Sequence, residues 1–188
     1  MTLAMSKLIL GFVGHLASGK DASKKYLEEK YGASSHRFST MLRDILNRIY
    51  VPINRQNLQD LSLDLRNRFG SDTLARVIAE DVNNDTHEVI IIDGIRRMDD
   101  IVNLKNVAGF YLISIEAKEQ NRFERMKNRN ENVGDAKKSF EDFINDGKKE
   151  AELEIPLVMS HARFTINNDG SFDDLHKQID EIIINLQK

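Results

Sequence analysis

The sequence contains no cysteine among its 188 residues. Disulfide bonds and thiolate metal sites are therefore excluded, and the composition fits a reducing compartment. Long hydrophobic runs are also missing, and no stretch approaches the length of a transmembrane helix. An excess of one charge is lacking too, because 27 Lys and Arg stand against 30 Asp and Glu, a net charge of −3. Such a chain has no global field that favours nucleic acid or an anionic membrane, and we expect neither as a partner.

Metal-ligand spacing and internal repeats are absent as well. The five histidines, at positions 15, 36, 87, 161 and 176, form no ligand pattern, and only His15 is expected near a ligand. With no repeat and no low-complexity linker, a chain of this length predicts one domain over residues 1–188. The short apolar run near the start leads directly into the motif described below. This favours a structural strand over a signal peptide, and therefore a cytoplasmic protein.

Short apolar runs alternate with amphipathic segments along the chain, which is typical of an α/β fold with a parallel sheet. Strands are predicted at 8–13, 35–38, 89–92, 110–115 and 163–166, and helices at about 20–31, 39–50, 56–69, 72–84, 98–105, 118–129, 139–152 and 171–186. The run at 89–92 is apolar throughout, as expected for a strand covered on both faces. Ser39 and Asn54 are predicted as helix N-caps, and Gly70 as a helix stop.

A glycine-bearing turn joins the first predicted strand to the first predicted helix. Gly14 and Gly19 permit backbone angles that turn successive N–H groups inward around a phosphate chain. The helix that starts near Lys20 contributes its dipole, and Lys20 contributes positive charge for the terminal phosphates. This is the context of a P-loop, and a chance glycine turn is the alternative. The predicted ATP-binding residues are Gly14, His15, Leu16, Ala17, Ser18, Gly19, Lys20, Asp21 and Ala22, together with Arg125.

Two aspartates are candidate ligands for a Mg²⁺ cofactor. Asp21 stands where the motif has a Ser or Thr that holds magnesium. It can accept a hydrogen bond from a magnesium-bound water, or it only complements the helix N-terminus. Asp93 directly follows the buried strand at 89–92, and ligands of parallel sheets lie beyond the carboxyl ends of the strands. We therefore predict that Asp93 lies near the P-loop and holds the metal, with capping of the next helix as the alternative.

Arginines lie next to the ends of predicted elements. The planar guanidinium suits phosphate oxygens, so arginines from separate segments can converge on a second anion. The predicted acceptor-binding residues are Ser39, Arg43, Arg66, Arg96 and Arg97. For Arg66, at the end of an amphipathic helix, a solvated surface position is an equal alternative.

A basic stripe formed by Lys118, Arg122, Arg125 and Arg129 falls on one face of the helix predicted at 118–129. The helix runs into a polar, glycine-containing stretch at 128–138, which is typical of a mobile lid over a phosphate site. Neutralising the transferring phosphoryl group requires positive charge of this kind. The predicted catalytic residues are Lys20, Arg96, Arg125 and Arg129. A solvated helix face is the alternative for the stripe.

Taken together, these residues resemble the P-loop kinases of the nucleoside monophosphate kinase group over essentially the whole chain. The segment at 38–43 resembles the adenylate kinase stretch whose arginine, here Arg43, holds the acceptor phosphate. The segment at 93–97 resembles the Asp-Gly-Phe-Pro-Arg segment of those enzymes, with Arg97 in the register of the arginine. The resemblance implies a P-loop NTPase three-layer sandwich with a five-stranded parallel sheet flanked by helices. It also implies a helical acceptor-binding insert at about 39–70 and a lid at about 126–138.

Two closer resemblances compete. The segments at 65–72 and 93–96 are similar to archaeal kinases related to dephospho-CoA kinase, in which the arginine matches Arg96. Aspartate after the P-loop lysine, together with the Asp93-x-x-Arg96 pattern, is similar to phage deoxynucleoside monophosphate kinases and to phosphomevalonate kinase.

The acceptor class depends on whether an acid lies beside the attack point, because a hydroxyl acceptor benefits from a base whereas a phosphate is already an anion. Dephospho-CoA kinases place an aspartate just after the second strand, and here residues 37–40 contain no acid. The sequence therefore favours a kinase that transfers the γ-phosphoryl group of ATP to a nucleoside or deoxynucleoside monophosphate. The alternatives are a hydroxyl acceptor such as dephospho-CoA, with Asp93 as base, and a regulatory P-loop NTPase without a small-molecule acceptor.

Overall fold

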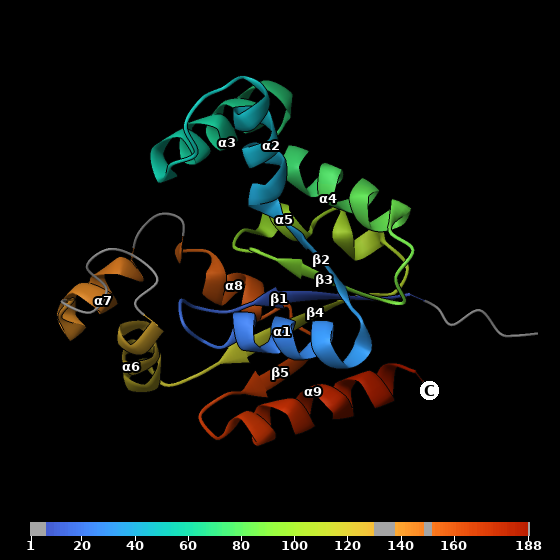
Figure 1. Ribbon diagram of the computed structural model, residues 1–188, viewed down its shortest axis with the longest axis vertical. Coiled ribbons are helices and arrows are strands. Elements are labelled where there is room, and N and C mark those ends of the chain that lie inside the picture. Colours follow the sequence, from blue (N-terminus) through green and yellow to red (C-terminus); the bar gives the residue numbers. More distant parts are fainter. Residues whose placement is uncertain (1–6, 130–137, 149–151, 188) are drawn as a thin grey trace, which may run out of the picture.

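A five-stranded sheet with the order β2-β3-β1-β4-β5 forms the centre of the computed structural model, which describes residues 7–129, 138–148 and 152–187 (Figure 1). The strands are β1 (Leu8–Val13), β2 (Ser34–Arg37), β3 (Val89–Asp93), β4 (Phe110–Glu116) and β5 (Phe164–Asn167). Every neighbouring pair is parallel. The predicted strands and the predicted α/β class are confirmed, with strand ends displaced by one residue at most.

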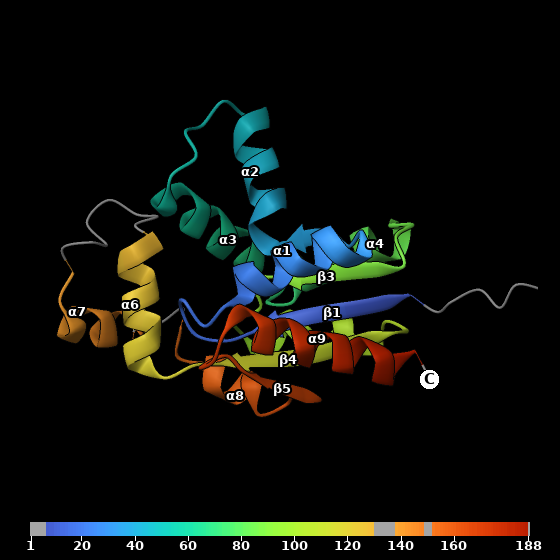
Figure 2. The ribbon, with the colours of Figure 1, turned by 60° about the horizontal axis from the view of Figure 1, so that its bottom comes forward.

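Alternation along the strands builds two separate apolar cores. In β1, Ile9 and Val13 face one core, whereas Leu8, Leu10 and Phe12 face the other. The first core is closed by α4 (Thr73–Asn84), α5 (Met98–Ile101) and α8 (Ile155–Met159). The second is closed by α1 (Lys20–Tyr31) and α9 (Phe172–Leu186), which lie together on the other face in Figures 1 and 2. The result is the predicted three-layer sandwich, in which the central strand ends directly at the P-loop.

Two helices, α2 (Phe38–Arg48) and α3 (Arg55–Phe69), rise from the sheet beside the P-loop end (Figure 2). Asn54 caps α3 by accepting the backbone N–H of Asn57, and Gly70 ends it, as predicted. The predicted N-cap role of Ser39 is wrong, because α2 begins one residue earlier and Arg37 occupies the N-cap position. These helices cover most of the segment predicted as an insert at 39–70.

The remaining helices differ from the sequence prediction in length. The helix expected at 98–105 is α5 followed by a 3₁₀ turn, η1 (Leu104–Asn106), and the one expected at 139–152 is the shorter α7 (Phe140–Asp146), which is followed by Gly147. Helix α8 was not predicted, although Pro156 in its first turn is a helix-start signal. Helix α6 (Glu119–Arg129) enters the predicted lid, of which residues 130–137 lie outside the described part. None of the described helices is long and apolar enough to cross a membrane.

Candidate active site

The turn between β1 and α1 has the backbone geometry of a phosphate-binding loop. Gly19 has a φ of 116°, and a Cβ there would collide with the side chain of Asn168. A Cβ on Gly14 would collide with the carbonyl oxygen of Ile115 and lie 2.7 Å from Ser18 Oγ. Both positions therefore require glycine, for backbone angle in one case and for close approach in both. Ala17, with a φ of 59°, completes the turn.

Lys20 is held at the mouth of this loop. Its Nζ donates to the carbonyl oxygens of Gly14, at 2.6 Å, and His15, at 2.9 Å. Burial lowers the pKa of Lys20 to about 8, against an opposing effect of the nearby Asp93 carboxylate. The ammonium is thus poorly solvated in the free protein, and an anion arriving at the loop would restore favourable electrostatics.

Asp93 lies at the end of β3 and is only 8% exposed. It is paired in register with Arg37, the last residue of β2. Arg37 Nε donates to Asp93 Oδ2 at 2.8 Å, and Arg37 Nη2 lies 2.7 Å from the same oxygen in an ion pair. Oδ1 accepts no hydrogen bond from any described residue, so one carboxylate oxygen stays available at the edge of the P-loop.

This donor set fits a magnesium ion bound to nucleotide. Magnesium in such sites is held by one or two carboxylates together with phosphate oxygens and water, rather than by a protein cage. The described residues contain no group of three or more His, Cys, Asp or Glu that could hold a metal alone. Asp93 Oδ1 is the oxygen suited to it. The other predicted metal residue, Asp21, is instead paired with Arg129 Nη1 at 2.5 Å.

Three arginines of α6 lie along the P-loop side. Arg122 is buried, and it donates to the carbonyl oxygen of Leu16 and stacks over the ring of Phe143. Arg125 Nη2 donates to the carbonyl oxygen of Asn168 at 2.7 Å, and Arg129 pairs with Asp21 as described above. The stripe that the sequence analysis singled out therefore faces the loop, whereas Lys118 precedes the helix and donates through its backbone to Asp169.

Two buried polar atoms at this junction, Arg125 Nη1 and Ser18 Oγ, have no hydrogen-bond partner among the residues that the structure describes. Buried polar groups in folded proteins are almost always satisfied, so exceptions call for a ligand, an ion or a water. Both belong to residues predicted to bind ATP. A phosphate chain lying on the loop would supply acceptors of the kind that both atoms lack.

The predicted acceptor residues lie on different segments and differ in whether they already have an ion-pair partner. Arg43 is exposed on α2 and makes no hydrogen bond or ion pair with any described residue. Arg96 Nη1 pairs with Glu152 Oε1 at 3.0 Å. Ser39 lies in the first turn of α2, and Arg97 immediately precedes α5.

Arg66 is already used by the fold. Its Nη2 donates to Asp100 Oδ1 at 2.9 Å, and its Nη1 donates to the carbonyl oxygen of Ser71. The Asp100 carboxylate is buried, and its other oxygen accepts the backbone N–H groups of Arg96 and Arg97. Arg66 therefore neutralises a buried acid that shapes the β3–α5 loop, and this contact gives its charge a role without an acceptor ligand.

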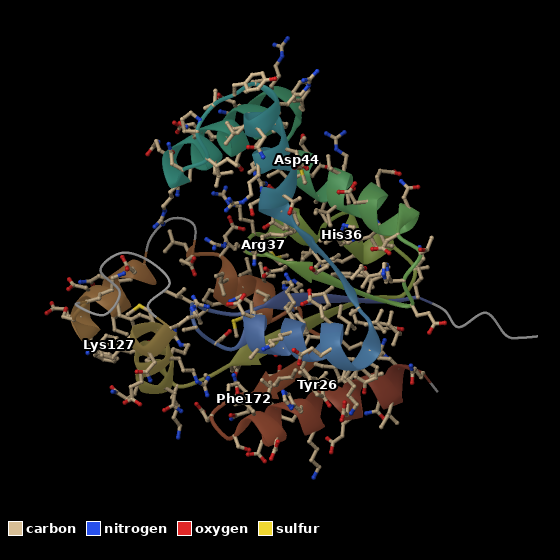
Figure 3. The ribbon with its side chains drawn as sticks, in the orientation of Figure 1. Tyr26, His36, Arg37, Asp44, Lys127 and Phe172 are labelled. Atoms are coloured by element: carbon tan, nitrogen blue, oxygen red, sulfur yellow. The ribbon has the colours of Figure 1, made fainter. Side chains whose placement is uncertain are left out.

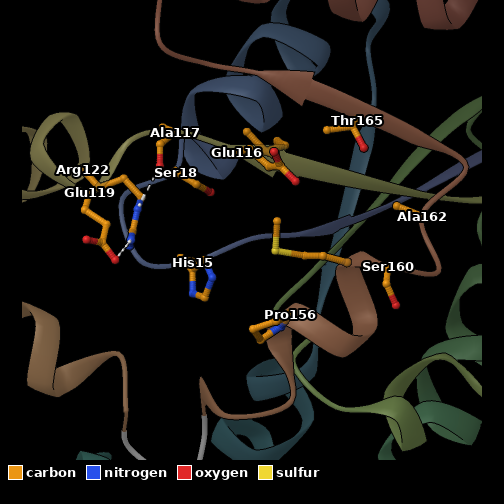
Figure 4. Close-up of a pocket in the computed structure, with 12 residues that line it drawn as sticks. His15, Ser18, Glu116, Ala117, Glu119, Arg122, Pro156, Ser160, Ala162 and Thr165 are labelled. Atoms are coloured by element: carbon orange, nitrogen blue, oxygen red, sulfur yellow. Dashed lines mark hydrogen bonds and ion pairs between the residues drawn. The ribbon is translucent and has the colours of Figure 1, made fainter.

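A cavity of about 620 Å³ opens on the α8 side of the loop (Figure 4). Its walls include His15 and Ser18 of the P-loop, Glu119 and Arg122 of α6, and Met159 of α8. Burial, and then the charge of Arg122, lower the pKa of His15, so this imidazole is neutral at pH 7. The volume is in the range of small-molecule sites.

Three residues at the site escaped the sequence analysis. Arg37 had a signal, since it lies within the second predicted strand at 35–38, and β2 pairs it in register with Asp93. Glu152 and Asn168 had none, because their partners, Arg96 and Ser18, are 56 and 150 residues away in the chain.

Comparison with known proteins gives archaeal relatives at low identity. No protein-family model matches the chain. A protein of Archaeoglobus fulgidus described as UPF0200/UPF0201 is 27% identical over 190 aligned residues, which cover 99% of this chain and 58% of that protein. The chain thus spans less than two thirds of that relative. A UPF0200 protein of Methanococcus maripaludis is 28% identical over 170 residues, which cover 88% of this chain and 90% of the relative.

Several solved structures with the same architecture are named as kinases. Shikimate kinase from Bacteroides thetaiotaomicron superposes with a TM-score of 0.62 at 14% identity, covering 96% of this chain and 99% of that chain. A gluconokinase from Sinorhizobium meliloti gives a TM-score of 0.58 at 11% identity, with coverage of 97% and 94%. The chain therefore has the fold of the P-loop kinases.

Proposed function

We propose that this protein is an ATP-dependent small-molecule kinase whose acceptor carries a phosphate, as a nucleoside or deoxynucleoside monophosphate does. The observation that carries the proposal is that a half-buried lysine and a carboxylate both lie at the P-loop, close enough for the carboxylate to raise the pKa of the lysine. Lys20 is held on the loop carbonyls, and Asp93, with one oxygen uncommitted, is near enough to affect its pKa. A cation for the phosphates next to a carboxylate for their magnesium ion is the minimum that phosphoryl transfer from Mg-ATP needs.

Each residue then has a proposed role. The P-loop amides and Lys20 hold the donor phosphates, and Asp93 holds Mg²⁺, which neutralises charge on the β- and γ-phosphates when bound. Arg125 and Arg129 supply positive charge from the α6 side. We assign the metal role to Asp93, which is buried at the end of β3, rather than to Asp21, whose side chain is 60% exposed.

The acceptor assignment is supported by the arginines near the carboxyl ends of β2 and β3. Arg43 is exposed and has no ion-pair partner among the described residues, and Arg96 and Arg97 follow Asp93 on the loop that leads into α5. Arginine binds phosphate through two parallel hydrogen bonds, and an attacking phosphate oxygen needs alignment more than a base.

A hydroxyl acceptor, such as dephospho-CoA, is the second candidate. It is favoured by the uncommitted oxygen of Asp93, which could accept the hydroxyl proton, and the kinases with solved structures named above are not named for nucleotide acceptors.

The experiment is acceptor-stimulated ADP release. Purified protein with Mg-ATP is screened against ribo- and deoxyribonucleoside monophosphates, dephospho-CoA and phosphomevalonate. The proposal expects strong stimulation by a monophosphate, with Lys20→Ala as the inactive control. Stimulation by dephospho-CoA alone would favour the hydroxyl reaction, and slow ADP release that no acceptor accelerates would favour a regulatory NTPase.

A further inference from the structure

Glu152 brings a carboxylate into a cluster of positive charges at the candidate site. Its side chain is 18% exposed, and its Oε1 accepts a hydrogen bond from Arg96 Nη1 at 3.0 Å. The same charge acts on Lys20 and His15, whose pKa values it raises against the larger lowering effect of burial. Glu152 thus lies within electrostatic range of the P-loop as well as in contact with the predicted acceptor arginine.

The position of Glu152 is fixed by its surroundings. Two residues further along, Glu154 Oε2 accepts the backbone N–H of Met98 at 3.0 Å, which ties this segment to the β3–α5 loop. Helix α8 follows at once, and its Ile155 and Val158 are buried in the core. The bond between Glu154 and Met98 and the packing of α8 therefore hold the carboxylate of Glu152 beside Arg96.

The cluster needs an anion whether or not a ligand is bound. Lys20, Arg96 and Arg122 come from three different segments, and the charge of Arg96 lowers the pKa of Lys20 while that of Arg122 lowers the pKa of His15. Glu152 supplies part of the compensating charge, together with Asp93 at Lys20 and Glu119 at Arg122. A phosphate arriving at Arg96 would carry up to two negative charges and would place them next to this carboxylate.

We propose that Glu152 is a specificity-determining residue of the acceptor subsite, an internal counter-ion on Arg96 that only a phosphate-bearing acceptor displaces. The inference rests on the proposed function, since it takes Arg96 as an acceptor ligand. A carboxylate ligand offers Arg96 nothing that Glu152 does not already provide. A phosphate dianion forms stronger paired hydrogen bonds with the guanidinium and can therefore exchange with it.

Binding of inorganic phosphate tests the inference without knowledge of the acceptor. The full chain is saturated with Mg-ADP to occupy the P-loop, and phosphate is titrated by calorimetry. Glu152→Gln keeps the shape of the side chain and removes its charge, so phosphate should bind about tenfold more tightly than to the unmodified protein. The matched control, Glu154→Gln, removes a nearby carboxylate that touches no arginine and should leave phosphate affinity unchanged.

Arg96→Gln in the Glu152→Gln background should abolish the gain, because the gain comes from releasing Arg96. Unchanged or weaker phosphate binding in Glu152→Gln, with the melting temperature preserved, would overturn the inference. An equal gain in phosphate affinity in Glu154→Gln would also overturn it, because the gain would then come from the loss of any nearby negative charge and not from the release of Arg96.

Turnover separates this inference from the proposed function. With a monophosphate acceptor identified, Glu152→Gln should lower its KM and leave kcat within a few-fold. A hundredfold loss of kcat with KM unchanged would refute the counter-ion role and indicate a general base acting on a hydroxyl. If no acceptor supports transfer, the proposed function fails, while the phosphate titration still decides whether Glu152 competes for Arg96.

Discussion

Two aspartates, one before β3 and one at its end, accept hydrogen bonds from side chains of the neighbouring strand β2. They differ in how many of their carboxylate oxygens accept such bonds. Asp85, before β3, receives hydrogen bonds from Ser34 Oγ at 2.5 Å, His36 Nε2 at 2.7 Å, and the backbone and ring nitrogens of His87. In the described part of the chain, Asp93, the last residue of β3, is bonded through its side chain by Arg37 alone, and only on Oδ2. His36 and Arg37 are adjacent in β2 and point to opposite faces (Figure 3).

The difference separates a structural carboxylate from an available one. Burial alone would raise the pKa of Asp85, but the hydrogen bonds from Ser34, His87 and His36 outweigh it and hold that pKa below its usual range. With both oxygens occupied, Asp85 joins β2 to the end of α4 and has nothing left to bind. Asp93 keeps one oxygen for a ligand at the end of the sheet where Lys20 lies.

The largest expected effect is at Lys20, whose pKa the Asp93 carboxylate raises. Lys20→Ala should lower kcat about a thousandfold, because it removes the cation that faces the transferring phosphoryl group. The melting temperature should stay close to that of the unmodified protein, since the lysine bonds only loop carbonyls. Steady-state ADP release and a thermal melt measure the two, and normal turnover by folded Lys20→Ala protein would remove the P-loop assignment.

Asp93→Asn should reduce kcat about a hundredfold and raise the Mg²⁺ concentration needed for half-maximal rate. The amide keeps the size of the side chain and can still accept from Arg37, so stability should change little. An unaltered magnesium titration would contradict the contrast with Asp85, because Asp93 would then also have only a structural role.

Arg43→Ala should raise the acceptor KM ten- to a hundredfold, since a charge-assisted hydrogen bond to phosphate contributes about 1.5–3 kcal/mol. Affinity for ATP should be preserved, as measured by nucleotide titration in the absence of acceptor. Loss of ATP affinity with an unchanged acceptor KM would assign α2 to the other ligand.

Asp85→Asn should affect stability and leave kcat unchanged at a temperature where the variant is folded. Removing the charge weakens several hydrogen bonds at once, and we expect a loss of about 1–3 kcal/mol in the free energy of unfolding at pH 7. Because the folded-state pKa of Asp85 lies below the unfolded value, its contribution is complete above about pH 4 and disappears as the pH falls below that. Urea unfolding at pH 7 and pH 3 should therefore show a large difference from the unmodified protein at pH 7 and a smaller one at pH 3. A loss of equal size at both pH values would contradict the charge-based explanation.

The smallest effect is expected for Asp21→Ser. Its carboxylate pairs with Arg129 and is 60% exposed, so the pair contributes less than about 1 kcal/mol. We expect a change in kcat of a few-fold and an unaltered magnesium titration. A clear shift in the magnesium requirement would place Asp21 in the metal shell and make it a second available carboxylate beside Asp93.

The sheet was predictable from sequence because each strand is an uninterrupted apolar run or lies next to a turn. The run at 89–92 needed no partner to be recognised, and neither did the glycine turn that follows β1. The caps and short helices were less predictable. Ser39 suits an N-cap by residue type, but α2 begins at Phe38. The side chain of Phe38 is buried in the core, which favours this start.

The site was predictable only where neighbours in the chain define it. Lys20 is positioned by its own loop, and Asp93 by its own strand. Arg66 and Arg96 were both predicted to bind the acceptor, yet Arg66 neutralises Asp100 and Arg96 pairs with Glu152, through contacts that span 34 and 56 residues. Such pairings depend on how α3, α5 and α8 pack, which no local pattern encodes.

One long-range hydrogen bond indicates when the P-loop can be completed during synthesis and folding of the chain. Asn168 Nδ2 donates to the carbonyl oxygen of Ser18 at 2.8 Å, so the P-loop near the start of the sequence is completed by a residue 150 positions later. The central strand β1 likewise waits for β3 and β4 to be synthesised before it has a partner on either side. Contacts between residues so far apart form late in folding. During translation, tight ATP binding should therefore begin only after β5 and Asn168 have left the ribosome, and nucleotide capture by stalled nascent chains of increasing length would time that moment.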